Sequence, residues 1–301
     1  MSDASAGDAA RGSVVTGIWR RVSVASRFVL HDPALAAATV LLGLLVLCAI
    51  IGPLVWRQDP LGIDVGGALQ PPSTAHPMGT DGNGRDLFAR FNEGARISLA
   101  VGAAVVLSGV LVGGLIGLAA GVLHRMVDSF LMRVLDAILA FPPLILAMAV
   151  TVGFGVGLRS AALGTMLTTV PYYARLLRSD VMRIRVLPHV ESAVALGASP
   201  KRIVFRHILP HAAPTMLIQS AAVFGYSILT LAALGFVGLG AQIPTPEWGA
   251  MITDGLQYSL TGQWWIAVFP GLGVLFAVVA ANILADRARD ILDPRGELSR
   301  V

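Results

Sequence analysis

Six long apolar stretches constrain the fold of this chain more than any other feature of its sequence. Each has about 20 residues or more, which is the length that an α-helix needs to cross the ~30 Å hydrocarbon core of a bilayer. They are residues 34–56, 98–123, 134–156, 160–178, 214–238 and 264–285. Lipid offers no hydrogen-bond partners to an exposed backbone, so the sequence predicts an all-α membrane protein with six transmembrane helices.

The composition supports this class and excludes others. Of the 301 residues, 55% are hydrophobic and only 13% are charged, which is about half the charged fraction of a soluble domain. The same numbers exclude a disordered chain. The single cysteine, Cys48, excludes an internal disulfide framework and a cysteine metal cluster.

Three of the stretches indicate that the helices pack as a bundle. Glycine recurs at every fourth position of residues 109–121, which predicts the close approach of a neighbouring helix. Two consecutive prolines at 142–143 imply a kink within the stretch 134–156. The stretch 160–178 is the most polar, and we expect it to lie among neighbouring helices because lipid satisfies none of its polar groups.

The distribution of basic residues sets the orientation that we expect. If the N-terminus lies in the cytoplasm, 17 of the 22 Lys and Arg residues fall on the inner side and five on the outer side. This bias predicts cytoplasmic tails over residues 1–33 and 286–301. Residues 1–33 lack an apolar segment with a cleavage site, so the first span is interpreted as an uncleaved signal anchor. The basic excess is thus a topology signal, and no nucleic-acid binding is expected.

Two connections are too long to be simple turns, residues 57–97 outside and residues 179–213 inside. Within the inner connection, residues 190–196 predict a short helix, and Gly197 suits the left-handed residue that stops it. This short helix is mostly apolar and has charged residues around it. Exposed apolar surfaces rimmed by charge usually bind a partner protein. The alternative is a helix that lies in the headgroup region, with its basic neighbours on lipid phosphates.

A second short helix is predicted over residues 201–209. Ser199 is a good N-cap, and Pro200 fits the first helical position. We expect this helix to end at Pro210, because a proline clashes with the preceding turn.

The segments 191–193 (Glu-Ser-Ala), Gly197 and 209–210 (Leu-Pro) resemble a known loop. It is the E-A-A-x-x-x-G…L-P loop of the membrane subunits of ATP-binding cassette (ABC) importers. The spacing agrees, although Ser192 stands where the family has alanine. In that family the loop forms the coupling helix, which docks into a groove of an ATPase subunit. The resemblance implies the same role for residues 191–197, within a coupling loop at 188–210. The ATPase-coupling residues that the resemblance implies are Glu191, Ser192, Ala193, Leu196, Gly197, Lys201 and Arg202.

Further segments narrow this resemblance. Residues 76–86, followed by residues 94–99, are similar to the outer segment of dipeptide, oligopeptide and nickel permeases. Residues 246–251 and 286–295 resemble two other marks of that group. Over residues 20–295 the chain therefore resembles the "C" type permease subunit of the dipeptide/oligopeptide/nickel ABC importers.

The resemblance implies the type I ABC importer permease fold, with a peripheral first span and a core over residues 98–285. It implies a multi-pass subunit of an ATP-driven peptide importer in the bacterial inner membrane, surrounded by lipid. A second homologous permease would complete the pathway. Two ATPases would bind ATP and Mg²⁺, with no cofactor in this chain, and an extracytoplasmic binding protein would dock near residues 57–97 and 239–263. The docking residues implied are Asp81, Arg85, Asp86 and Trp248.

The residues leave the substrate open among dipeptides, oligopeptides, glutathione-like peptides and nickel chelates. The chain contains no G-x-x-x-x-G-K-[ST], G-x-S-x-G or H-E-x-x-H motif, so we expect a transport subunit and not an enzyme. The alternative is a stand-alone ion-coupled secondary transporter, which would need charged or unwound sites at the membrane midplane. Asp136 is the one acid just inside a span, and we expect it to pair with Arg133.

No metal site is expected. His207 and His211 are four residues apart, but Pro210 lies between them and no third ligand is near in the sequence. Residues 81–86 begin like a calcium loop, yet Arg85 stands at a position that needs an oxygen ligand. We interpret that segment as a glycine-rich turn that orders Arg85 and the acid after it.

Overall fold

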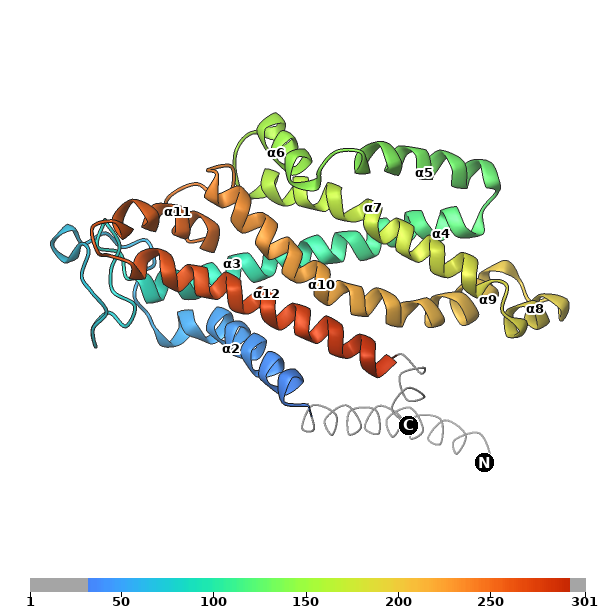
Figure 1. The fold of residues 1–301 in the computed structure, drawn as a ribbon, viewed down its shortest axis with the longest axis horizontal. Helices are drawn as coiled ribbons and strands as arrows, with labels where there is room; N and C mark the ends of the chain where they lie inside the picture. The colour runs from blue at the N-terminus through green and yellow to red at the C-terminus, as the bar shows by residue number, and fades with distance from the viewer. Residues whose placement is uncertain (1–31, 293–301) are drawn as a thin grey trace, which may run out of the picture.

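The computed structural model describes residues 32–292, which are helical without any β-strand and so confirm the all-α class. The helices run along one long axis, with residues 57–86 and α11 at one end and α8 and α9 at the other (Figure 1). The longer helices are α2 (Pro33–Val55), α3 (Leu87–Ser108), α4 (Gly114–Val122), α5 (Arg125–Leu139), α6 (Pro143–Phe154), α7 (Leu158–Ile184), α10 (Leu209–Phe236), α11 (Trp248–Ser259) and α12 (Trp265–Leu292). The short ones are α8 (Pro188–Ala195) and α9 (Pro200–Ile203).

Several of these helices are suited to cross a membrane. Within the described residues, four continuous helical segments are long and apolar enough, and the bent pair α5–α6 is a fifth candidate. The four are Pro33–Val55, Leu87–Val122, Pro200–Phe236 and Trp265–Asp290. The most polar expected span, residues 160–178, is α7, whose buried threonine hydroxyls donate to carbonyl oxygens one turn earlier. This internal bonding lets α7 lie within the bundle without external partners.

The kink expected within residues 134–156 is confirmed, and it is a complete break in the helix. A break separates α5 from α6, and the two helices meet at an angle of 88°. Pro142 and Pro143 explain it, because proline lacks an N–H donor and restricts the residue before it to extended conformations. Pro143 becomes the first residue of α6.

The expected helix end at Pro210 is wrong. The helix continues from Pro200 to Phe236 through a π-helical turn at Val204–Ile208. The wider π turn shifts the hydrogen-bond ladder where the proline ring would otherwise meet the preceding carbonyls. The short second helix of the sequence interpretation is therefore the start of a long rod. The span expected to begin at residue 98 likewise begins earlier, at Leu87.

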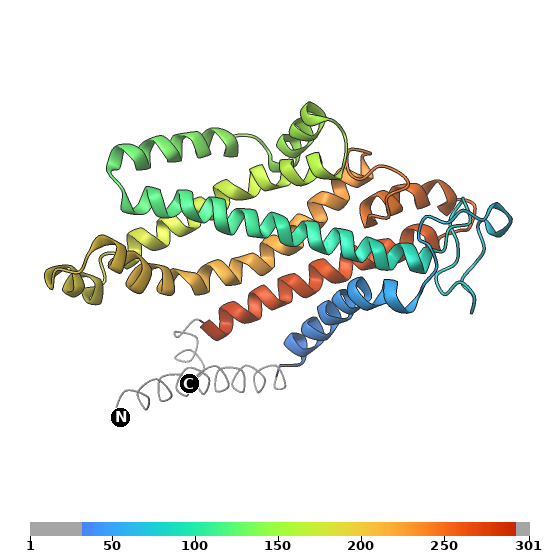
Figure 2. The same cartoon turned by 180° about the vertical axis from the view of Figure 1, so that it is seen from behind.

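The glycines at every fourth position of residues 109–121 pack against α7, as expected. A Cβ at Gly113 would lie 2.5 Å from the carbonyl oxygen of Val170, and one at Gly117 would overlap the carbonyl of Ala174. The backbones therefore touch along this seam. Figure 2 shows α3 and α4, joined by the π-helical turn Gly109–Gly113, as one rod along the whole bundle.

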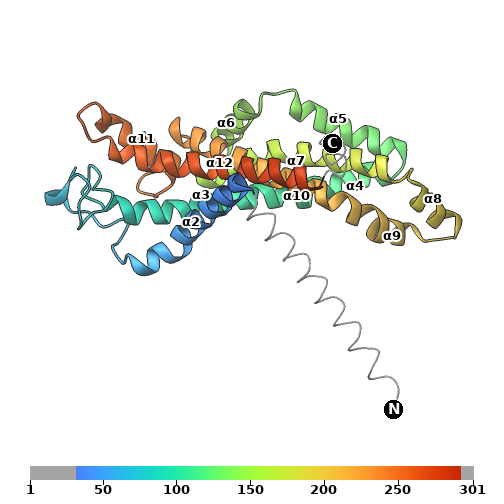
Figure 3. The same ribbon diagram turned by 60° about the horizontal axis from the view of Figure 1, so that its bottom comes forward.

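Helices α2 and α5–α6 lie at opposite edges of the bundle (Figures 1 and 3). α2 packs on α3 and α12, whereas α5 packs on α4 and α7. Asp32 caps the start of α2 and forms an ion pair of 3.0 Å with Arg287 near the end of α12. The chain therefore enters and leaves the bundle at the same end.

The expected tails fall mostly outside the described residues. Of the tail at 1–33, only Asp32 and Pro33 are described, and Pro33 is already the first residue of α2. The tail expected at 286–301 is corrected in part, because residues 286–292 extend α12. The end of the 286–295 motif lies outside the described residues.

Candidate functional site

Two regions at opposite ends of the bundle carry the expected site residues. The first is the 188–208 loop, formed by α8, α9 and the π-helical turn. The second, which we call the platform, consists of residues 57–86 together with α11 (Figure 1).

A single buried side chain anchors α8 to the bundle. Val190 packs into an apolar cluster with Ile184 of α7 and Ile208, the last residue of the π-helical turn before α10. Among the residues of α8 it is the one that is fully buried. Val190 therefore connects α8 both to α7 and to the turn that leads into α10.

The turn after α8 has a defined shape. Gly197 has φ +81°, the left-handed conformation that the sequence predicts. Its N–H donates to the carbonyl of Val194 at 2.9 Å, and the N–H of Ala198 donates to the carbonyl of Ala193 at 3.0 Å. These two bonds form a Schellman motif, which ends α8 sharply. Ser199 then caps α9, as expected.

The 188–208 loop presents apolar side chains to its surroundings. Leu196 at the tip is 88% exposed, and Val194 and Phe205 are also exposed. Six of the seven expected coupling residues are exposed, and Ala193 is half-buried. Lys201 and Arg202, on the helix that follows this apolar tip, are exposed as well. The surface has the composition of a partner site, with an apolar centre and a charged rim.

The structure brings a third histidine to the pair that the sequence singled out. The ring of His189 on α8 stacks on that of His211 at 4.8 Å and lies 6.2 Å from that of His207. The sequence did not indicate this third ring, which the fold brings close by returning α10 beside α8. Across residues 32–292, however, no three His, Cys, Asp or Glu side chains are placed to hold a metal ion.

In the platform, Asp86 ties three segments together. Its carboxylate caps α3 by accepting from the N–H of Ala89 at 2.7 Å. It also accepts from the indole N–H of Trp56 at the end of α2, at 2.9 Å, and lies 2.7 Å from Nδ1 of His76. The outer ends of α2 and α3 are thereby fixed to the loop between them.

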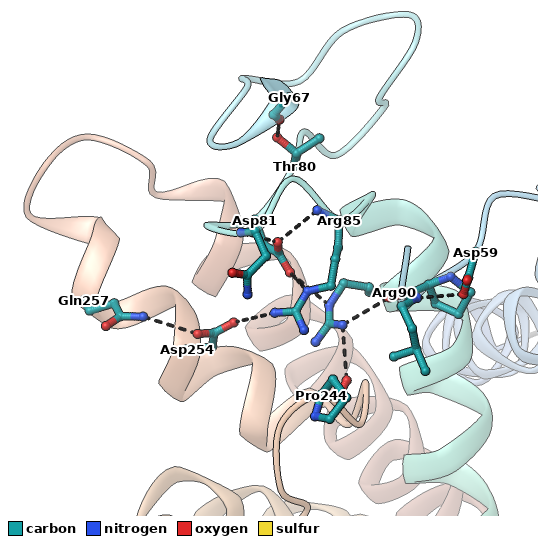
Figure 4. Close-up of polar contacts among 12 residues, drawn as sticks. Asp59, Gly67, Thr80, Asp81, Arg85, Arg90, Pro244, Asp254 and Gln257 are labelled. Carbon is teal, nitrogen blue, oxygen red and sulfur yellow. Dashed lines mark hydrogen bonds and ion pairs between the residues drawn. The ribbon is translucent and has the colours of Figure 1, made fainter. Parts of the chain in front are cut away.

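Asp81 forms the centre of a buried ion network (Figure 4). One carboxylate oxygen accepts from the N–H of Arg85 at 3.0 Å, and the other lies 2.6 Å from Nε of Arg85 and 3.3 Å from Nε of Arg90. Arg85 also reaches Asp254 on α11, with Nη2 3.4 Å from the carboxylate. Burial raises the pKa of Asp254, and the nearby Asp81 carboxylate adds to this shift. The turn thus orders Arg85, as the sequence predicts.

A second set of bonds joins α11 to α3. The indole N–H of Trp248 donates to the carbonyl of Phe91 at 3.2 Å. The Glu247 carboxylate caps α11 through the N–H groups of Gly249 and Ala250, both at 3.0 Å, and accepts from the hydroxyl of Ser98 at 3.1 Å. Burial raises the pKa of Glu247, and these three bonds oppose that shift.

The expectation that four platform side chains themselves contact a docked protein is corrected here. Their side chains are enclosed by the platform, with 0–4% exposure, so they frame it from within. They are Asp81, Arg85, Asp86 and Trp248. The sequence interpretation missed Arg90, Glu247 and Asp254 as their partners. It also missed the exposed apolar tip of the platform, which the alternation of Leu61, Ile63 and Val65 in the sequence signals.

The expected pairing of Asp136 with Arg133 is wrong. Asp136 pairs with Arg175 of α7, because α5 lies along α7 and offers it one face. A parallel pair joins Arg178 to Asp128.

Comparisons with known proteins agree on one family. A family described as "Binding-protein-dependent transport system inner membrane component" matches residues 113–297. The probable D,D-dipeptide transport system permease protein DdpC of Escherichia coli is 39% identical over 264 residues, 88% of each chain. The dipeptide transport system permease protein DppC of Alkalihalophilus pseudofirmus is 39% identical over 250 residues, 83% of this chain and 82% of that one. The glutathione transport system permease protein GsiD of Pectobacterium atrosepticum is 40% identical over 224 residues, 74% of each chain.

A solved structure supports the fold. Inward-facing structures of the MetNI methionine ABC transporter include a chain that superposes with a TM-score of 0.54. The two chains are 20% identical, and the match covers 66% of this chain and 95% of that one. This likeness speaks for the fold alone.

Proposed function

We propose a function from one premise: the chain belongs to the family of binding-protein-dependent transport system inner membrane components. It has the type I ABC importer permease fold. Its relatives carry the names of peptide, dipeptide and glutathione permeases over most of its length. We infer that it is the integral membrane permease subunit of an ATP-driven peptide importer, and that it forms the translocation pathway with a second homologous permease.

The observation that carries this function is the apolar tip of the 188–208 loop. Leu196 is 88% exposed at the end of a short helix that one buried valine holds to the bundle. We assign this tip to an ATPase subunit, with Leu196 as the apolar contact and Glu191, Lys201 and Arg202 as its charged rim. Ser192 and Ala193 are small enough to allow a close approach, and Gly197 shapes the turn.

Family membership implies ATPase and other ABC partners. We propose two ATPases, which bind ATP and Mg²⁺ outside this chain, so that the chain itself performs no catalysis. We also propose an extracytoplasmic binding protein that docks on the platform. The four enclosed side chains that were expected to contact it act from within: Asp81 and Arg85 connect the platform loop to α11, Asp86 fixes the outer ends of α2 and α3, and Trp248 joins α11 to α3.

The family places the chain in a membrane as a multi-pass protein. We propose the bacterial inner membrane, with both termini cytoplasmic and the platform outside. The 17-to-five distribution of basic residues supports this orientation. The ion pair between Asp32 and Arg287 supports it as well, because it puts the start of α2 and the end of α12 on one side.

The geometry suggests how the loop transmits movement. Val190 of α8 packs with Ile184 of α7 and Ile208 of the π-helical turn, and α9, this turn and α10 form one helical segment from Pro200 to Phe236. A shift of α8 on ATPase closure would therefore tilt a rod that reaches the platform end. Such rigid-body motion is a common basis of alternating access.

Gly197→Val tests the role of this loop. Gly197 has φ +81°, and an added Cβ would meet no atom within 4 Å, so valine strains the turn without a clash elsewhere. We expect transport to be lost while membrane insertion is unchanged, measured as peptide uptake and chain abundance in membranes. Normal uptake by the variant would contradict the assignment.

Purification of the tagged chain from its native host tests the function as a whole. We expect ATPases and a second permease to purify with it. Peptide transport by this chain alone in liposomes without ATP would instead establish the stand-alone secondary transporter.

A further inference from the structure

A hollow of about 320 Å³ lies between α5, α6, α7 and α10. Thr168, Thr169, Tyr172 and Tyr226 are among its lining residues, and none of the side chains that line it is charged. The two threonine hydroxyls are already bonded to the carbonyl of Thr165. Both tyrosines are partly exposed, so the hollow opens on the surface of the chain. It suits the uncharged middle of a short peptide.

A charged pair flanks the hollow on the side of the 188–208 loop. Asp136 precedes the lining residue Leu139 by three positions on α5, and Arg175 follows the lining residue Tyr172 by three positions on α7. Residues three apart share a helix face, so both charges border the hollow. They pair with each other and are 49% (Arg175) and 58% (Asp136) exposed.

The neighbouring pair has a different character. Arg178 donates two parallel hydrogen bonds to Asp128, one of them 2.7 Å long, and both side chains are less exposed, at 29% and 16%. A bidentate pair of this kind holds geometry well. It fixes α5 to α7, so the Arg175–Asp136 pair is not needed for that task.

We propose that Arg175 and Asp136 bind the charged termini of a peptide as it leaves the hollow. The inference rests on the proposed function and names a recognition site for it. The guanidinium of Arg175 donates hydrogen bonds to the peptide carboxylate, and the carboxylate of Asp136 accepts hydrogen bonds from the terminal ammonium. An exposed ion pair is weak and opens easily, whereas a peptide terminus in an uncharged hollow lacks a partner. Peptide binding therefore replaces the ion pair between Arg175 and Asp136 by two ion pairs, one at each peptide terminus.

The test measures uptake of a radiolabelled dipeptide by cells that carry the complete importer. The variants are Arg175→Gln, Asp136→Asn and the exchange Arg175→Asp with Asp136→Arg. Arg178→Gln serves as the matched control. Co-purification and peptide-free ATPase activity report the amount of assembled complex for each.

We expect each neutral variant of the Arg175–Asp136 pair to lower uptake per assembled complex about tenfold, the order of one charge-assisted hydrogen bond. We expect the exchange variant to stay low, because a rebuilt pair of reversed polarity meets the wrong terminus. Arg178→Gln should lower the amount of assembled complex. Its uptake per complex should stay within about twofold of the wild-type value, which is less than the loss of a charged contact to the peptide would cause. Restored uptake in the exchange variant, or unchanged uptake in Arg175→Gln, would overturn the proposal. A wild-type importer that takes up no peptide would instead overturn the proposed function.

Discussion

The platform encloses the charged side chains of its ion network, whereas the 188–208 loop exposes its charged side chains. Asp81 of the platform contacts both Arg85 and, on the adjoining α3, Arg90, and all three side chains have almost no exposure. In the loop, Lys201 and Arg202 are exposed, as is Leu196. The two regions sit at opposite ends of the same bundle.

This difference in exposure indicates whether each region makes its contacts within the chain or with another protein. Enclosed charges are stable only when paired, so the platform must complete its own contacts during folding. An exposed apolar tip gains nothing within the chain, so the loop gains its contacts from another protein. Substitutions in the platform should therefore reduce folding, and substitutions in the loop should reduce assembly.

The largest expected effect follows from Arg85→Ala. The variant leaves the enclosed carboxylates of Asp81 and Asp254 without this partner, which costs about 3–5 kcal/mol of unfolding free energy. We expect a sharp fall in chain abundance in membranes and in the Tm of the purified complex. Arg96→Ala is the control, because its exposed pair with Glu93, at 3.8 Å, contributes less than about 1 kcal/mol. Equal stability of the two variants would break the comparison.

A pair of glycine substitutions gives the next effect. Gly84 and Gly197 both have positive φ, at +74° and +81°. An alanine Cβ at Gly84 would overlap the carbonyl of Asp64, whereas one at Gly197 would meet no atom within 4 Å. We expect Gly84→Ala to cost about 2–4 kcal/mol and Gly197→Ala about 1 kcal/mol, measured by thermal unfolding. A larger cost at Gly197 would mean that the loop is as tightly enclosed as the platform.

The smallest effect is a pH dependence confined to the platform. Burial raises the pKa of Asp254 above its ordinary value of 3.8. The folded chain then holds this proton more tightly than the unfolded chain. Its contribution to stability is full below pH 3.8 and is lost as the pH rises through the folded-state pKa.

Asp254→Asn removes this titration. We therefore expect the Tm of the wild type, relative to that of the variant, to be higher at pH 4.5 than at pH 7.5. The shift should be within about 2–4 °C, the change that 1 kcal/mol produces in a domain of this size. A relative Tm that rises with pH would have the wrong sign for an enclosed carboxylate.

Much of the fold follows from local patterns in the sequence. Apolar length located most of the spans, the glycine repeat located the seam with α7, and Gly197 located the end of α8. Each of these features depends on residues within a few turns of one another. The prediction that a helix ends at Pro210 failed because the π-helical turn just before it accommodates the proline within a continuous helix. Such turns are rare and are not indicated by the local sequence.

The enclosed state of the platform could not be predicted in the same way. Asp81 and Arg85 stand in a polar, glycine-rich segment that is typical of an exposed loop. Their burial depends on α11, and Arg85 contacts Asp254 across 169 residues of sequence. The loop at 188–208 was easier, because its exposed residues interact little with distant segments.

Recovery of an ATPase with the purified chain tests the central claim most directly. Leu196→Asp places a charge at the tip of the loop, and Leu260→Asp places one at an equally open leucine, 96% exposed, at the platform end. We predict that both variants insert normally and retain the second permease. The amount of ATPase that purifies with Leu196→Asp should fall at least about tenfold, because binding would bury an unpaired charge. The amount that purifies with Leu260→Asp should be unchanged. Full recovery of the ATPase with Leu196→Asp would contradict the assignment of this loop.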